Sequence, residues 1–302
     1  MSAQRVSVVV VNYNYERFLR DALESVLAQR YENFELLVVD DGSTDESRSI
    51  LEGYRDRVRS IFQDNQGVSA ARNRGIAEST APLVAFLDSD DMWHPDKLAR
   101  QIERLQDASV GMVYTGLRYV DVDGNTLGTM LDGRRGQMLE ELALLRSPGV
   151  PASGSSAMIR RSVLEKVGPF DESLSTSSDW DMWRRIACHT SIDVVSEGLV
   201  FYRQHPNAMH MNVETFERDM LRAFESMFAD PAARVVHALE RRCYGKLYLT
   251  LAGSYLHAGN VKKSMDCLVR ALTAWPPGIA YVAATPLRYL ERGIGRPDKG
   301  SF

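Results

Sequence analysis

The chain has 302 residues, of which 44% are hydrophobic and 25% charged, and its net charge at pH 7 is −4. This composition suits one large globular domain, alone or with a small annex, and excludes a chain too polar to bury a core. The longest apolar stretches are too short to cross a membrane, and we expect no nucleic-acid partner.

The first third of the chain alternates short apolar runs with amphipathic segments. Strands are predicted at residues 6–11, 34–39, 58–62 and 83–87, and helices at about 16–29, 45–54 and 68–78. Strands that alternate with helices at this spacing favour a doubly wound, mostly parallel α/β sheet.

Further elements are predicted along the rest of the chain. We expect a helix at 95–106, strands at 111–115, 157–159 and 194–202, a hairpin at 120–127, and a helix at about 180–189. Residues 128–155 favour a loop with one short helix near 138–145, which we expect to exclude water from a site and to be a mobile, disordered lid while no donor is bound. The pattern is helical from residue 213, so we predict a main domain over 1–210, with halves at about 1–115 and 116–210, and a helical annex over 211–302.

Three cysteines, Cys188, Cys243 and Cys267, have no spacing typical of a metal site. Their odd number argues against a disulfide framework and favours a reducing cytoplasm, and the N-terminus resembles no signal peptide. Charge is uneven, because residues 233–302 carry 11 Lys and Arg against 4 Asp and Glu. A peripheral contact with anionic lipid at the inner face of a membrane is one interpretation, and a helical surface that is merely basic is the simpler one.

The first two predicted strands end in residues suited to a nucleobase. Val11-Asn12-Tyr13-Asn14 offers an aromatic ring that can stack on a base, although a surface turn explains Tyr13 equally well. Asp40-Asp41-Gly42-Ser43 offers a carboxylate that can accept a ring N–H, and its glycine permits close approach. A helix cap explains one of these two acids but not the second.

The next two segments carry charge. Gly67 to Gly75 places Arg72 and Arg74 on a predicted helix, where they could meet phosphate or simply be solvated. Asp88-Ser89-Asp90-Asp91 follows the apolar run 83–87. Neighbouring carboxylates repel unless a cation neutralises them, so a hard metal ion holding a diphosphate is one interpretation and an acidic turn is the other.

The series VVVVNYN, VVDDGSTD, GVSAARNRG and FLDSDDMWHPDKL, in this order across residues 7–98, resembles the family 2 glycosyltransferases of GT-A fold. The resemblance implies inverting transfer of a sugar from a nucleotide-sugar donor, often a UDP-sugar, with Mg²⁺ or Mn²⁺ on the diphosphate. The residues implied to contact the donor are Val11, Tyr13, Asp41, Arg72 and Asp88. Asp90 would be the main metal ligand.

The resemblance continues in the second half. Ser178-Asp179-Trp180-Asp181 is similar to the acceptor-side motif whose Asp is the catalytic base, although Ser178 stands where the family usually has Glu. Asp179 is therefore the expected base, with Asp181 as an alternative and a helix cap as the plain interpretation of either acid. Tyr202 to Pro206 resembles a segment that closes over the diphosphate, where His205 could complete the metal shell.

We therefore expect a metal-dependent hexosyltransferase that acts on a hydroxyl of a glycan or lipid-linked glycan, in surface polysaccharide biosynthesis. A non-catalytic nucleotide-sugar-binding or scaffold protein is the alternative. A nucleotidyltransferase is disfavoured, because the N-terminal region lacks a Gly-rich loop with Lys or Arg.

Overall fold

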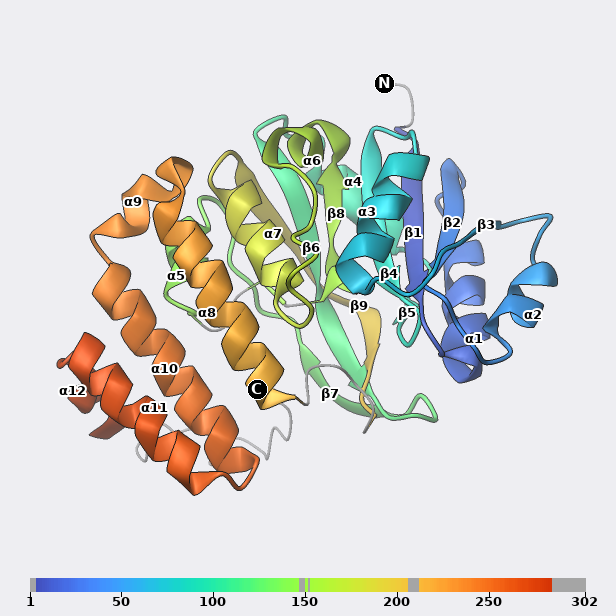
Figure 1. Cartoon of the computed structure of the whole chain (residues 1–302). Coiled ribbons are helices and arrows are strands. Elements are labelled where there is room, and N and C mark those ends of the chain that lie inside the picture. Colours follow the sequence, from blue (N-terminus) through green and yellow to red (C-terminus); the bar gives the residue numbers. More distant parts are fainter. Residues whose placement is uncertain (1–3, 147–149, 152, 206–211, 284–302) are drawn as a thin grey trace.

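The computed structural model describes residues 4–146, 150–151, 153–205 and 212–283. Its centre is a nine-stranded mixed sheet in the order β3-β2-β1-β4-β8-β6-β9-β5, with β7 paired to β6. Helices cover both faces of this sheet, and the C-terminal helices lie together at one side of it (Figure 1).

The N-terminal part of the sheet is parallel. Its strands are β1 (Val6–Asn12), β2 (Phe34–Asp40), β3 (Arg59–Phe62) and β4 (Leu83–Asp88). The connecting helices are α1 (Glu16–Leu27), α2 (Ser47–Glu52) and α3 (Val68–Glu78). Because parallel strands end at the same edge, the loops after β1, β2 and β4 meet there, as the strand-end motifs require.

The second part of the sheet is mixed. Its elements are β5 (Met92–Trp93), α4 (Lys97–Arg104), β6 (Val110–Val120), β7 (Thr126–Met130), α5 (Leu139–Ala143), η1 (Gly154–Ser156), β8 (Met158–Arg160), α6 (Arg161–Val167), α7 (Ser178–Ala187) and β9 (Ser191–Arg203). β8 runs antiparallel to β4 and β6, whereas β6 and β9 are parallel. The predicted hairpin is confirmed as β6–β7, and the predicted mostly parallel sheet is confirmed with antiparallel strands added.

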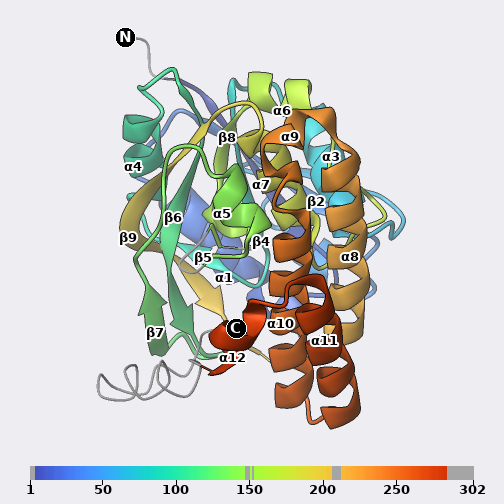
Figure 2. The same cartoon turned by 90° about the vertical axis from the view of Figure 1, so that its left-hand side faces the viewer.

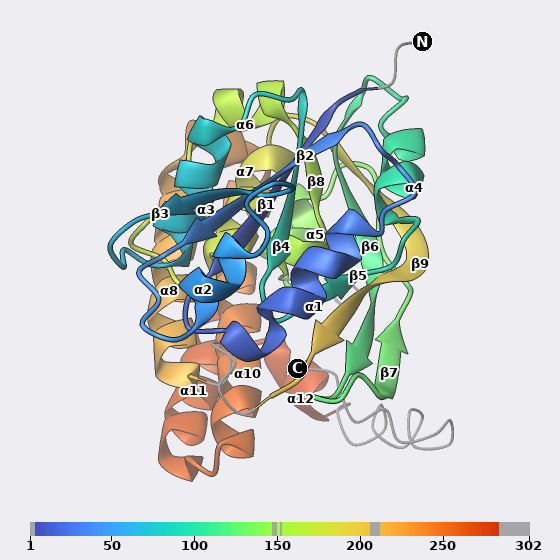
Figure 3. The ribbon, with the colours of Figure 1, turned by 90° about the vertical axis from the view of Figure 1, so that its right-hand side faces the viewer.

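Both faces of the parallel strands are buried, which explains their unbroken apolar runs. Along β1, Val9 and Val11 join the core under α3 and α7, while Val8 and Val10 join the core under α1 and α4. Figures 1 and 3 show these helices on the two sides of the sheet. The close approach of α3 depends on Gly75, since a Cβ there would lie 2.2 Å from a methyl group of Val9.

The C-terminal helices form a separate layer. They are α8 (Val213–Ala229), η3 (Pro231–Ala233), α9 (Arg234–His237), α10 (Glu240–His257), α11 (Val261–Ala274) and α12 (Gly278–Ala283). α10 and α11 form a hairpin, and Figure 2 shows the two helices side by side. None of the described helices is long and apolar enough to cross a bilayer. The division at residue 210 stays a prediction, but α8, beyond it, packs directly on α7.

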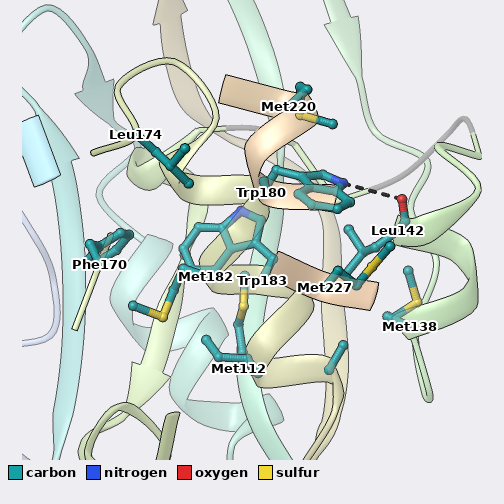
Figure 4. Close-up of a cluster of buried hydrophobic side chains, with 14 of the residues drawn as sticks. Met112, Met138, Leu142, Phe170, Leu174, Trp180, Met182, Trp183, Met220 and Met227 are labelled. Carbon is teal, nitrogen blue, oxygen red and sulfur yellow. Dashed lines mark hydrogen bonds between the residues drawn. The ribbon is translucent and has the colours of Figure 1, made fainter. Parts of the chain in front are cut away.

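The segment 128–155 is more ordered than a loop. α5 lies where a short helix was predicted, and it buries Leu139, Leu142 and Ala143 in the core. Its carbonyl at Leu142 accepts a hydrogen bond from the Trp180 indole at 3.3 Å (Figure 4). This described part of the segment is therefore packed, which argues against its acting as a mobile lid.

Candidate active site

The loops after β1 and β2 are fastened to each other. The Asn12 amide donates to Asp40 at 2.8 Å and to the Ser43 hydroxyl at 3.1 Å, and Ser43 also accepts the backbone N–H of Asn14. Val11 is buried in β1 opposite Asp88. Tyr13 stands on this loop with 45% of its surface exposed, so its ring is available for stacking.

Asp41 has an orienting role that the sequence does not reveal. Its carboxylate accepts hydrogen bonds from the Gln63 side chain at 2.7 Å and from the backbone N–H groups of Gln66 at 2.9 Å and Gly67 at 2.8 Å. These bonds hold the turn that leads into α3. A carboxylate offers about four acceptor positions, so about one remains for a base N–H.

The acids of the cluster after β4, Asp88, Asp90 and Asp91, differ in their burial. Asp91 is buried, and it accepts the Ser155 hydroxyl at 2.6 Å and the Arg203 N–H at 3.0 Å. Ser155 in turn accepts the N–H of Asp88 at 3.0 Å. Burial and the negative charges of the neighbouring Asp90 and Asp88 raise the pKa of the Asp91 carboxyl. Asp91 and Ser155 thus form a support beneath the cluster.

Asp90 and His205 come together although they are 115 residues apart in the sequence. The His205 Nε2 lies 3.0 Å from Asp90 Oδ2, and the Tyr15 ring packs against the imidazole edge-on at 5.6 Å. Burial, followed by the charge of Asp90, raises the pKa of the Tyr15 hydroxyl. The cluster is rich in negative charge, part of which Arg72 balances through its ion pair with Asp88.

These donors fit a divalent cation. In this structure Asp90 and His205 are hydrogen-bonded to each other at 3.0 Å. Two ligands at right angles on an octahedral ion with bonds of about 2.1 Å also stand about 3 Å apart, so the same two side chains could hold such an ion. No group of three or more Asp, Glu, His or Cys side chains in the described part of the chain could hold a metal ion. An ion held by Asp90 and His205 would therefore need further ligands from the donor or from water.

Arg72 joins the two halves of the site. Its guanidinium is buried and contacts Asp88 at 2.8 Å through one amino group and Asp179 at 2.6 Å through the other. The centre of the Phe170 ring lies 5.5 Å from the guanidinium carbon of Arg72. A Cβ at Gly154 would come within 2.8 Å of an Arg72 amino nitrogen, so the glycine leaves room for this side chain. Burial raises the pKa of the Asp88 carboxyl, although Arg72 opposes this. Arg72 was predicted to meet phosphate, and here both its amino groups are held by carboxylates.

Asp179 lies in the first turn of α7, as predicted for the base. Its side chain is 10% exposed, and only Oδ1 accepts a hydrogen bond from a described residue, namely Arg72. Asp181 differs, because its two oxygens are held by Arg184 at 2.8 Å and Arg185 at 2.9 Å. This structural pairing makes Asp179 the better candidate. Ser178 lies 3.4 Å from Arg72.

Two contributors were missed from the sequence. Ser155 lies in a segment rich in Gly, Ser and Pro, and nothing in its neighbours distinguishes it. Tyr15 directly follows the first strand-end motif, and its aromatic character was the one available signal.

The chain belongs to glycosyl transferase family 2, whose family profile it matches over residues 7–168. It is 38% identical over 224 residues to an uncharacterized glycosyltransferase of Nostoc sp., covering 69% of this chain and 67% of that protein. It is 37% identical over 126 residues to the putative teichuronic acid biosynthesis glycosyltransferase TuaG of Bacillus subtilis, covering 40% and 50%. The matches thus span about two thirds of these relatives or less.

Solved structures confirm the GT-A fold. S. aureus TarS 1–349 in complex with UDP-GlcNAc superposes with a TM-score of 0.64 at 16% identity, over 87% of this chain and 90% of that one. The mannosyltransferase PcManGT of Pyrobaculum calidifontis, in complex with GDP-Man and Mn²⁺, gives 0.63 at 18% identity, over 95% and 83%. At these identities the likeness establishes the fold alone.

Proposed function

We propose that this chain is an inverting glycosyltransferase that moves a sugar from a UDP-sugar to a hydroxyl of a glycan or lipid-linked glycan. The observation that carries the proposal is the Arg72 bridge, which sets Asp179 beside Asp88 at the strand edge where GT-A folds bind donors. TuaG is named for teichuronic acid biosynthesis, which supports a surface polysaccharide as product. The complex of TarS with UDP-GlcNAc is in keeping with a UDP-sugar donor.

Donor binding would use the loops after β1, β2 and β4. The exposed ring of Tyr13 stacks on the base, the remaining acceptor position of Asp41 takes its N–H, and Asp88 faces the ribose. Val11 is buried in β1 beside Asp88, beneath these loops. Because both amino groups of Arg72 are held by carboxylates, we propose that it acts on the donor through Asp88.

Asp179 would remove the acceptor proton. Inverting transfer is one in-line displacement, so a base must stand opposite the leaving diphosphate. Arg72 donates a hydrogen bond to Oδ1. Oδ2 accepts no hydrogen bond from the described residues, so this oxygen is the one that would take the proton of an acceptor hydroxyl.

Asp90 and His205 would hold Mg²⁺ or Mn²⁺. When bound, the cation neutralises charge on the leaving diphosphate. The residues themselves bring a carboxylate and an imidazole to one point, and Arg203 fixes this loop by donating to the Asp90 carbonyl at 3.0 Å.

The test is donor hydrolysis and transfer with a panel of UDP-, GDP- and dTDP-sugars and Mn²⁺, beside UDP binding by calorimetry. Asp179→Asn should keep UDP binding and lose turnover, whereas Asp90→Asn should weaken binding only when Mn²⁺ is present. Asp121→Asn, in the exposed β6–β7 turn, is the matched control and should change neither. Donor binding with zero turnover in the wild type would favour the non-catalytic binding protein instead.

We also propose that the annex touches the cytoplasmic face of a membrane, where a lipid-linked acceptor would lie. Residues 234–283 carry seven Lys and Arg against two Asp and Glu. Val261, Met265 and Val269 form an exposed apolar row on α11. Flotation with vesicles of phosphatidylglycerol should recover the protein and vesicles of phosphatidylcholine should not. Met265→Asp should abolish the difference, and equal recovery on both lipids would refute the contact.

A further inference from the structure

The helix that carries the proposed base is held by a residue far beyond the family match. Asp219 lies on α8 and is fully buried. Its Oδ2 accepts the backbone N–H groups of Ser175 at 2.8 Å and Thr176 at 2.9 Å, and their hydroxyls at 3.0 and 3.2 Å. One carboxylate oxygen therefore fixes the turn that leads into α7.

Among the described residues, Asp219 is the acceptor for the backbone of this turn, while Ser69 holds the preceding Leu174 carbonyl at 2.8 Å and Arg72 holds Asp179 itself. The N-cap of α7 is Ser177, whose side chain makes no capping hydrogen bond. The backbone N–H groups before a helix need acceptors when they are buried, and Asp219 supplies them from a neighbouring helix. Asp179 follows Thr176 by three residues, so a shift of the turn moves the base.

Two more contacts tie α8 along the length of α7. Trp180 and Phe224 stack with ring centroids 4.9 Å apart. Figure 4 shows Trp180 between Met220 and Met227 of α8 and Leu142 of α5. At the far end, Arg184 contacts Asp230 at 3.1 Å. α7 and α8 are therefore in contact at three points along α7, with Asp219 at the end nearest the site.

Asp219 is held in its ionised form by this arrangement. Burial opposes the charge, but hydrogen bonds from Ser175, Thr176 and Arg218 outweigh it and lower the pKa of the carboxyl. Charge-assisted hydrogen bonds of this kind are about twice as strong as neutral ones. The ionised Asp219 carboxylate therefore anchors the turn at 175–176 through strong hydrogen bonds.

We infer that Asp219 is a positioning residue for catalysis, which orients Asp179 by fixing the turn at 175–176. The inference rests on the proposed function and adds to it a requirement for α8. It predicts that loss of this carboxylate damages the chemical step and spares donor binding, because Asp219 lies on the α7 side of the Arg72 bridge.

The test compares Asp219→Asn and Asp219→Ala with wild type in donor turnover. We expect kcat to fall about 100-fold with donor KM within about threefold, since small displacements of a reacting group cost this much. In an Asp179→Asn background the same change should lower the residual rate no further. Glu225→Gln is the matched control, because it neutralises an exposed carboxylate on the same helix.

Hydrogen–deuterium exchange supplies a readout that needs no turnover. Asp219→Asn should speed exchange of the amides at 175–180, while Glu225→Gln leaves them unchanged. Unchanged exchange in Asp219→Asn overturns the inference, and so does a kcat within twofold of wild type or an equal loss in the Asp179→Asn background. A wild type without turnover would refute the proposed function, and the exchange result would still decide whether Asp219 holds the turn.

Discussion

Replacing Arg72 with Met would test the bridge between the two halves of the site. Met keeps much of the apolar stem but leaves the carboxylates of Asp88 and Asp179 without their cation. Breaking a buried ion pair by removing one partner costs about 3–5 kcal/mol. The Asp88 side chain is 25% exposed and that of Asp179 10%, so water relieves part of the penalty. We expect a loss of about 3 kcal/mol.

Urea denaturation followed by tryptophan fluorescence measures this loss, because Trp93, Trp180 and Trp183 are buried. With a slope of about 3 kcal/mol per molar urea for a chain of this size, the midpoint should fall by about 1 M. Arg72→Lys should lie between Met and wild type, since one ammonium cannot reproduce the guanidinium fork.

A further variant of Arg72→Met removes the negative charges of the two unpaired carboxylates, Asp88 and Asp179. If the cost comes from unpaired carboxylates, Asp88→Asn together with Asp179→Asn should restore at least half of the stability lost in Arg72→Met. A loss below about 1 kcal/mol for Arg72→Met, or no recovery in the triple variant, would show that the bridge contributes little and that the reasoning is wrong.

Three further outcomes follow from the packing. Gly75→Ala should destabilise by about 1–3 kcal/mol by pushing α3 off β1, whereas Gly253→Ala, with open space at its Cβ, should be neutral or stabilising in a thermal melt. Phe224→Ala should lower the free energy of unfolding by about 3–5 kcal/mol; a loss under about 1 kcal/mol would contradict the buried stack. Because the pKa of Asp219 is lowered in the fold, its stabilisation is present above its unfolded pKa of about 3.9 and lost as pH falls through the folded value. The wild-type advantage over Asp219→Asn in melting temperature should therefore shrink between pH 5 and pH 2, and a constant gap would contradict this.

Strands that form continuous apolar runs could be predicted from the sequence. β1, β2 and β4 are apolar on both faces, so their runs and the loops that follow them were identified within a residue or two. β5 was missed because two residues carry no periodic signal. The antiparallel direction of β8 was also missed, because pairing with β4 and β6 is a tertiary property that three residues do not encode.

In the candidate site, too, features set by the local sequence were predicted and those set by tertiary packing were not. Acids at strand ends were recognised because topology alone brings them to one edge. The partners of Arg72 were not, since Asp179 lies 107 residues away and the contact depends on how α7 packs. Ser155 is a small polar residue in a polar segment, 64 residues from Asp91. Its role comes from buried hydrogen bonds to Asp91 and Asp88, which form only in the folded protein.

The contact between α7 and α8 has a practical consequence for protein engineering. The family profile ends at residue 168, so a chimera designed from it would join a foreign C-terminal half near that point or at 210. A junction at 210 would separate Ser175 from Asp219 and leave Trp180 without Phe224. Exchanges meant to alter acceptor choice should transplant residues 175–230 as one cassette, with crossover points in the loops outside it.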